Sequence, residues 1–260
     1  MQGTLEGLIL LAVVGLLILL RFDARRFGAA EYDDEEAPGG WRTWLRRLSW
    51  YVFGLLLLLV VYFLYPQPLS VLHLQMGEPR TQTLILGLGL GAMGIAFALV
   101  YAWLRFSELR LPPARRYPGG VINAVATAFI DEAVFRGILL GLLIASDWPV
   151  NYAIAFQAVL YALSTRLAGR GRPRGMLLLE LAVGVIGGAL TLQSGGIGAA
   201  FLGHALTRLA IFIAMGHAGQ MRAVAIDEEE EALEQTTSHA PAGWGVVVDR
   251  EQGGPSDYRW

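Results

Sequence analysis

The sequence predicts an all-α fold, namely a polytopic transmembrane helical bundle of about seven membrane spans. Three observations predict this class: the composition, the length of the apolar segments and the placement of arginine. Of the 260 residues, 55% are hydrophobic and only 16% are charged, and the mean hydropathy is +0.49. This balance is far from that of an ordinary soluble domain, so a membrane protein is the first expectation.

The apolar segments have the lengths that membrane spans require. A hydrocarbon layer about 30 Å thick is crossed by roughly 20 mostly apolar residues in a helix. Seven segments meet or approach this length, and they cover residues 5–20, 48–65, 83–104, 121–145, 149–167, 176–192 and 197–215.

Arginine placement predicts how these spans are oriented. All twenty basic residues are arginine, and cytoplasmic loops of membrane proteins carry an excess of positive charge. Seventeen arginines follow the first, third and fifth spans or lie in the C-terminal tail, including Arg21 directly after the first span, whereas the opposite side has only Arg80. Arg136 and Arg208 fall inside spans. The pattern predicts an N-terminus outside and a C-terminus in the cytoplasm.

Four regions follow from these spans. Residues 1–47 form an N-terminal membrane anchor with an Arg-rich and acidic cytoplasmic loop, and residues 48–118 form two transmembrane helices with a basic loop. Residues 119–216 hold the remaining spans, and residues 217–260 form a cytoplasmic, disordered tail. The acidic stretches 31–40 and 226–235 have the composition of solvated, disordered segments. A cleaved signal peptide is the alternative for the first span, but residues 1–6 lack its positive start.

Several function classes are disfavoured by composition. The chain has no cysteine, which excludes disulfides and thiol chemistry. The formal net charge of −2 indicates no nucleic-acid partner. The stretch "GLGAMG" at residues 89–94 fits a dinucleotide-binding fingerprint but lies within a span, where that motif has no strand or helix start. We instead expect the glycine pairs Gly87/Gly91 and Gly184/Gly188 to allow close helix packing.

Six ionisable side chains lie within the last four spans, and they are the candidate functional residues. A charge at the bilayer centre costs at least about 2.5 to 3.5 kcal/mol, so such groups normally face a partner or a cavity. They are Asp131, Glu132, Arg136, Glu180, His204 and Arg208. Glu132 and Arg136 are i, i+4 neighbours in the favourable order, which predicts an internal ion pair.

Asp131 points about 100° away from Glu132 on an α-helix and therefore needs another partner. At about 1.5 Å of rise per residue, Asp131, His204 and Arg208 fall at similar depths in antiparallel helices, so a cluster of these three is geometrically feasible. Histidine beside a partly desolvated carboxylate suits general-base activation of water. Glu180 is expected to be structural, paired with Arg208 or Arg166.

Three motifs carry a resemblance to a known family. The stretch "DEAVFRG" is similar to the E-E-x-x-x-R motif of the CPBP family of intramembrane proteases, which includes the type II CAAX prenyl endopeptidases. "AIAFQAVLYALST" matches the register of a second motif, an aromatic followed four residues later by histidine. "LAVGVIGGALTLQSGGIGAAFLGHALTR" resembles the third region, which ends in H-x-x-x-N. The resemblance covers residues 119–216 and makes them a CPBP-like core.

The resemblance implies peptide hydrolysis by a water that the first-motif carboxylate and second-motif histidine activate, with the third motif stabilising the oxyanion. Glu132, Arg136 and His204 match the motifs. Asp131 replaces glutamate, Thr165 replaces the second-motif histidine, and Arg208 replaces asparagine. The implied catalytic residues are thus Asp131, Glu132, Arg136, His204 and Arg208, with Thr165 binding substrate. A metal ion is conceivable for the family, but Thr165 and Arg208 disfavour it, so no cofactor is expected.

The resulting function hypothesis is an intramembrane endopeptidase in the cell (plasma) membrane. Its partners would be membrane lipid and a membrane-associated or prenylated peptide or protein substrate. The alternative is a catalytically inactive pseudoprotease that acts as a membrane binding or scaffold protein, since Thr165 and Arg208 depart from the motifs. A transporter or channel that uses the charges as a relay is a third hypothesis, which the absence of an inverted repeat disfavours.

Overall fold

A computed structural model describes residues 2–27, 29, 41–106, 111, 112, 114, 117–168 and 174–214, and these residues form helices joined by turns. Three regions that the sequence predicts to be disordered lie outside the described residues: the acidic stretches 31–40 and 226–235 and the tail 217–260. The chain divides into a unit of residues 1–218 and a second of residues 219–260.

The helices of the first unit follow the predicted apolar segments closely. The long elements are α1 (Gln2–Phe22), α2 (Trp41–Leu64), α4 (Arg80–Phe106), α5 (Tyr117–Asp131), α7 (Val150–Ala168), α8 (Arg174–Ser194) and α9 (Gly198–Ala214). The short elements are η1 (Ala24–Phe27), α3 (Pro68–Val71), the π-helix η3 (Glu132–Leu139) and α6 (Leu140–Ala145). Because α5, η3 and α6 continue one another without a break, the predicted span 121–145 is one helical rod.

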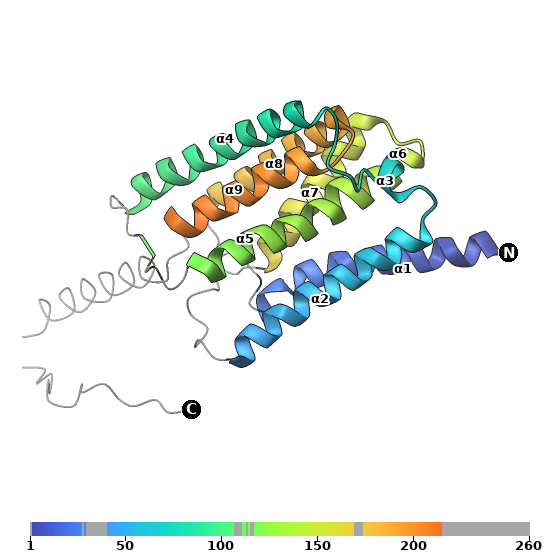
Figure 1. Cartoon of the computed structure of the whole chain (residues 1–260), viewed down its shortest axis with the longest axis horizontal. Helices are drawn as coiled ribbons and strands as arrows, with labels where there is room; N and C mark the ends of the chain where they lie inside the picture. The colour runs from blue at the N-terminus through green and yellow to red at the C-terminus, as the bar shows by residue number, and fades with distance from the viewer. Residues whose placement is uncertain are drawn as a thin grey trace, which may run out of the picture. The chain divides into compact units, whose positions relative to one another are not determined.

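Proline and glycine mark the ends of several helices. Pro68 and Pro118 lie in the first turns of α3 and α5, where a missing backbone N–H removes no helical hydrogen bond. Gly195 follows α8 with φ of +69°, the left-handed conformation that commonly ends a helix and favours glycine. These residues allow the chain to reverse between long antiparallel helices (Figure 1).

The outer helices carry apolar side chains on their exposed faces. Leu56 and Phe63 of α2 and Ile85 and Leu88 of α4 are exposed, while polar groups are buried inside. Three helical segments, Trp44–Leu64, Arg80–Leu104 and Leu177–Ser194, are long and apolar enough to cross a membrane, and shorter apolar helices accompany them. The predicted class, a helical membrane bundle, is confirmed, and the sidedness of the spans stays a prediction.

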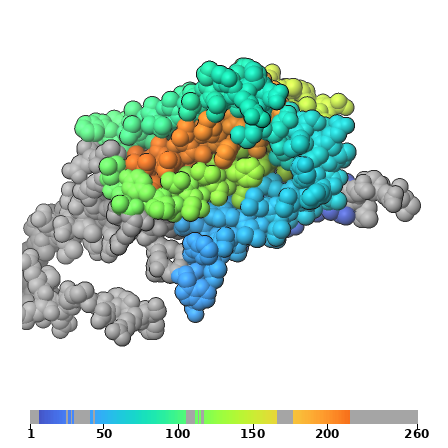
Figure 2. All heavy atoms as spheres, viewed as in Figure 1, coloured from blue at the N-terminus to red at the C-terminus, as the bar shows by residue number. Residues whose placement is uncertain are grey.

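Glycine controls the closest helix contacts, as the sequence predicted. The helix α4 packs most extensively on α9, which is seen between α4 and α5 on the face in Figure 2. A Cβ on Gly87 would lie 2.9 Å from the Ala199 oxygen, and one on Gly184 would lie 2.8 Å from the Ala158 Cβ. Only glycine permits these approaches. Residues 89–94 lie within α4, so "GLGAMG" serves no nucleotide site of the strand–turn–helix kind.

The segment between α2 and α4 ties the first helices to the last ones. Gln75 Nε2 donates a hydrogen bond of 2.7 Å to the Gly195 oxygen. The Glu78 N–H donates to the Ser194 oxygen and the Ile197 N–H donates to the His73 oxygen, at 2.9 and 3.1 Å. This segment therefore lies against the α8–α9 turn and fixes the end of the bundle at which α4 and α9 begin (Figure 1).

Candidate functional site

The charged motif lies on a π-helical segment inside the bundle. The eight residues of η3, from Glu132 to Leu139, are all buried, and Asp131, the last residue of α5, is 1% exposed. A π-helix is rare, forms i→i+5 hydrogen bonds and occurs frequently at functional sites. The local change of helical repeat alters the direction of the side chains relative to a regular α-helix. The sequence did not predict it.

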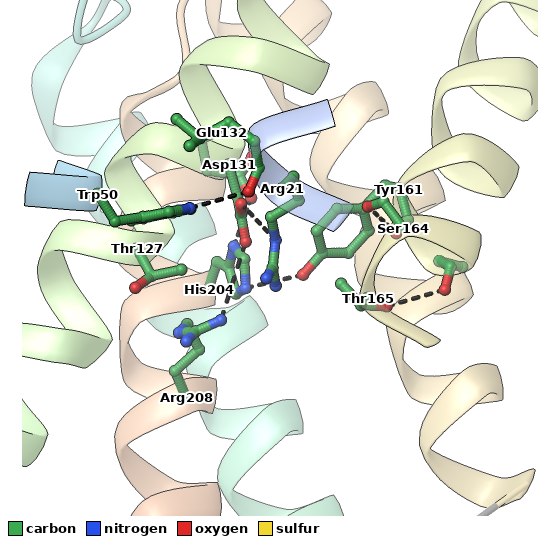
Figure 3. A network of polar contacts seen from close by, with 12 residues as sticks. Arg21, Trp50, Thr127, Asp131, Glu132, Tyr161, Ser164, Thr165, His204 and Arg208 are labelled. Carbon is green, nitrogen blue, oxygen red and sulfur yellow. Dashed lines mark hydrogen bonds and ion pairs between the residues drawn. The ribbon is translucent and has the colours of Figure 1, made fainter. Parts of the chain in front are cut away.

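Glu132 is the centre of the first group of contacts (Figure 3). Its Oε1 lies 3.1 Å from Arg136 Nη1, which confirms the predicted i, i+4 ion pair. The same oxygen lies 2.7 Å from Nδ1 of His204 on α9. The other ring nitrogen of His204, Nε2, lies 2.9 Å from the hydroxyl of Tyr161 on α7. The Arg136 guanidinium stacks over the Tyr161 ring at 4.0 Å.

These contacts assign the protons around His204. A carboxylate only accepts hydrogen bonds, so Nδ1 carries the proton and donates to Glu132. In the neutral ring Nε2 then accepts, and the Tyr161 hydroxyl donates to it. The chain Tyr161, His204, Glu132 is therefore a directed hydrogen-bond chain that fixes the imidazole and one carboxylate oxygen.

The buried arginine and carboxylate side chains are balanced in number. Among the described residues, the buried guanidinium groups number three and the buried carboxylates also number three: Arg21, Arg136 and Arg208 against Asp131, Glu132 and Glu180.

Asp131 has a different partner from the one the sequence suggested. Its Oδ1 lies 2.8 Å from Nε of Arg21, the last basic residue of α1, and its Oδ2 lies 3.8 Å from Arg208 Nη1. The expected proximity of Asp131 and Arg208 is confirmed, but His204 binds Glu132 and not Asp131. The placement of Arg21 in a cytoplasmic loop is wrong, since Arg21 is 2% exposed within the bundle.

Sequence reasoning missed three residues of this site: Arg21, Trp50 and Tyr161. Trp50 Nε1 donates a hydrogen bond of 2.9 Å to the Leu20 oxygen, which holds the last turn of α1 next to Asp131. A signal existed for two of them. Arg21 directly ends an apolar run, and Tyr161 is the aromatic residue of the second motif. Nothing in the sequence indicated that α1 reaches the charged motif.

Thr165 and Glu180 complete the set of predicted residues. The buried Thr165 hydroxyl donates a hydrogen bond of 2.8 Å to the Ala162 oxygen within α7, so its lone pairs are left to accept. Its predicted contact with substrate stays a prediction. Glu180 is buried on α8 and is engaged in a polar interaction, which agrees with a structural role.

Three buried carboxylate oxygens of the site have no hydrogen-bond partner among the described residues: Asp131 Oδ1 and Oδ2, which face arginines in ion pairs, and Glu132 Oε2. Glu132 Oε2 and Arg136 Nε are both buried and unpartnered in this sense. Both border Gly187 of α8: a Cβ built there would lie 3.7 Å from Glu132 Oε2 and 3.4 Å from Arg136 Nε. A Cβ at position 187 would therefore make only ordinary van der Waals contacts with these atoms.

The donor set does not fit a metal ion. No group of three or more histidine, aspartate or glutamate side chains within the described ranges could hold one. His204 uses both ring nitrogens in hydrogen bonds, and guanidinium groups that repel a cation flank both carboxylates.

The fold and the site together define a helical integral membrane protein with a charged site buried inside the bundle. The family model of type II CAAX prenyl endopeptidase Rce1-like proteins matches residues 113–210. This match confirms the predicted resemblance to the CPBP family. The matched segment contains Asp131, Glu132, Arg136, Thr165, His204 and Arg208, whereas Arg21 and Trp50 lie outside it. No curated protein and no solved structure matches the chain.

Proposed function

We propose that the protein is a membrane endopeptidase that hydrolyses peptide bonds of membrane-associated or prenylated substrates. One observation carries the proposal. His204 and Arg136 hold Glu132 Oε1, while Oε2 is buried without a hydrogen-bond partner among the described residues. A carboxylate fixed through one oxygen keeps the other to accept a proton, which general-base catalysis requires.

Of the two carboxylates of the motif, Glu132 is the better candidate for the base. Both oxygens of Asp131 face guanidinium groups, Oδ1 at 2.8 Å from Arg21 and Oδ2 at 3.8 Å from Arg208, whereas the ion pair and the hydrogen bond of Glu132 are both made by Oε1. Asp131 would instead hold Arg21 and Arg208 in place. Of the two carboxylates predicted to be catalytic, Glu132 would thus be the base and Asp131 a positioning residue.

The proposed reaction follows from these roles. Glu132 Oε2 takes a proton from water as the water oxygen bonds to the peptide carbonyl carbon. Arg208 donates hydrogen bonds to the oxyanion that forms. The C–N bond then breaks as Glu132 returns the proton to the leaving amine. His204 holds Glu132, and Thr165 accepts a hydrogen bond from the substrate backbone.

The site residues are at most 3% exposed, so substrate entry requires a movement of the surrounding helices. The burial of these residues also favours the second candidate function, that of a non-catalytic relative that binds a membrane partner. The specific observation behind this alternative is the direct ion pair between Asp131 and Arg21, combined with threonine at position 165.

Turnover of a prenylated peptide distinguishes the two functions. Purified protein in liposomes is incubated with a farnesylated, fluorescence-quenched peptide, as wild type and as Glu132→Gln, and Glu78→Gln serves as the exposed control. The proposal predicts cleavage by wild type and Glu78→Gln and a loss of about 10²-fold or more in Glu132→Gln. Equal cleavage by all three proteins, or none by wild type, contradicts it.

A further inference from the structure

The first two turns of α2 carry an exposed apolar stripe. Four apolar residues follow the i, i+3, i+4, i+7 spacing that places side chains on one face of a helix. They are Trp41, Trp44, Leu45 and Leu48, and they are between 37% and 70% exposed. Figure 2 shows these turns, in blue, standing out from the helices around them. The stripe therefore faces the surroundings of the protein and not its core.

Two exposed arginines, Arg42 and Arg46, flank this stripe. They are i, i+4 neighbours, so their side chains lie on the same side of it. The Arg42 guanidinium lies over the Trp41 ring at 5.9 Å, and the ion pairs among the described residues involve neither arginine. The helix itself contains no aspartate or glutamate. The stripe and the two arginines, together called the Trp/Arg surface, thus combine apolar area with positive charge.

The Trp/Arg surface lies at the start of a segment that is long and apolar enough to cross a membrane. That segment runs from Trp44 to Leu64, and a rise of about 1.5 Å per residue keeps both arginines within roughly one turn of its first residue. Tryptophan is enriched at the membrane–water interface, and arginine extends its charged group toward the headgroups there. The predicted sidedness puts this surface at the cytoplasmic leaflet, which carries anionic lipids.

We propose that the Trp/Arg surface binds the headgroups of anionic phospholipids. The guanidinium groups of Arg42 and Arg46 donate hydrogen bonds to the lipid phosphate, while the apolar stripe packs on the adjoining acyl chains. The positive charge selects a lipid with net negative charge over a zwitterionic one. Trp50, which follows on the same helix, holds the last turn of α1, so the lipid binds to the helix that supports the charged site. The inference does not depend on peptidase activity.

Two double variants that each remove two positive charges test this surface. Arg42→Gln/Arg46→Gln alters it, and Arg26→Gln/Arg80→Gln is the matched control at two exposed arginines elsewhere in the chain. Arg42→Lys/Arg46→Lys keeps the charge. The full-length protein in nonionic detergent is titrated with phosphatidylglycerol or with phosphatidylcholine of the same acyl chains, and bound lipid is measured by native mass spectrometry.

Wild type should bind phosphatidylglycerol more tightly than phosphatidylcholine. Arg42→Gln/Arg46→Gln should weaken the binding of phosphatidylglycerol by about 30-fold, which corresponds to about 1 kcal/mol for each arginine near an anionic surface, and leave the binding of phosphatidylcholine unchanged. The lysine variant and the control should bind phosphatidylglycerol as wild type does, because the first keeps the charge of the surface and the second leaves the surface intact.

Three results would overturn the inference. Equal affinity of wild type for the two lipids would mean that the arginines select no anionic headgroup. An equal loss in the control variant would mean that net charge, and not this surface, attracts the lipid. A dimer of the detergent-solubilised protein that Trp41→Ser/Trp44→Ser converts to a monomer, as measured by light scattering, would mean that a second copy of the chain covers the stripe.

Discussion

The ion pair between Arg21 and Asp131 gives the most quantitative prediction. The Arg21 Nε and Asp131 Oδ1 atoms are 2.8 Å apart, and the side chains are 2% and 1% exposed. At an effective dielectric constant of about 20, their attraction is about 6 kcal/mol. Much of this offsets the cost of removing both charges from water, but removal of one partner leaves the other buried and uncompensated.

We therefore expect Arg21→Met and Asp131→Asn each to destabilise the protein by about 3 to 5 kcal/mol. For a chain of this size, that corresponds to a decrease in melting temperature of roughly 10 °C. The double variant removes both charges, so it should be less destabilised than the sum of the single variants by about 2 kcal/mol or more. Arg80→Met, at an exposed arginine, is the control for loss of a guanidinium.

The assay is thermal unfolding in detergent, followed by circular dichroism, for the four members of the cycle. A second cycle with Asp131→Asn and Arg208→Gln should give a smaller coupling, because those charged atoms are 3.8 Å apart. Additive effects of Arg21→Met and Asp131→Asn would refute the assignment of this pair. So would a larger coupling in the cycle with Arg208.

Three further predictions concern single side chains. Tyr161→Phe removes the hydroxyl that lies 2.9 Å from His204 Nε2, so we expect a loss of about 1 to 3 kcal/mol in thermal unfolding; an unchanged melting temperature would exclude this hydrogen bond. Thr165→Val should raise KM for the peptide and leave kcat unchanged, and an unaltered KM would exclude substrate contact. Burial lowers the pKa of His73 below 6.5, outweighing the opposite effect of its backbone contact with Gly195. The unfolded chain therefore binds the proton more readily, so stability should be full above about pH 6.5 and fall as the pH decreases through the lowered pKa. His73→Gln should remove that part of the pH dependence of the melting temperature, and an identical pH profile would contradict it.

The helices could be predicted from sequence because each depends on its own residues. An apolar run of about 20 residues predicts a span wherever it lies, and seven such segments are the long helical rods of the bundle. The pairing of Glu132 with Arg136 is also local, since i, i+4 neighbours meet on any helix. Close helix approach at Gly87 and Gly184 followed from the spacing of small residues.

The contacts between distant helices could not be predicted in this way. Whether His204 binds Asp131 or Glu132 depends on the rotation of one helix, and adjacent helical residues differ by about 100°. The π-helix that begins at Glu132 leaves no pattern in the sequence. The contact of Arg21 with Asp131 joins residues 110 positions apart and depends on the depth that α1 reaches.

The position of Arg21 also affects how the Rce1-like domain is understood. The matched segment begins at residue 113, yet a buried carboxylate of its motif is paired with α1. We therefore regard α1 and Trp50, which anchors its last turn, as part of the site.

The most direct test of the account is the rate at which purified wild-type protein in liposomes cleaves a farnesylated peptide, compared with Glu132→Gln and His204→Ala. The account predicts cleavage by wild type, a loss of about 10²-fold or more in Glu132→Gln, and a clear reduction in His204→Ala, which leaves Glu132 without its fixed hydrogen bond. Cleavage at the same rate by all three proteins would contradict the assignment of the base, and a wild-type protein that cleaves no peptide would contradict the function itself.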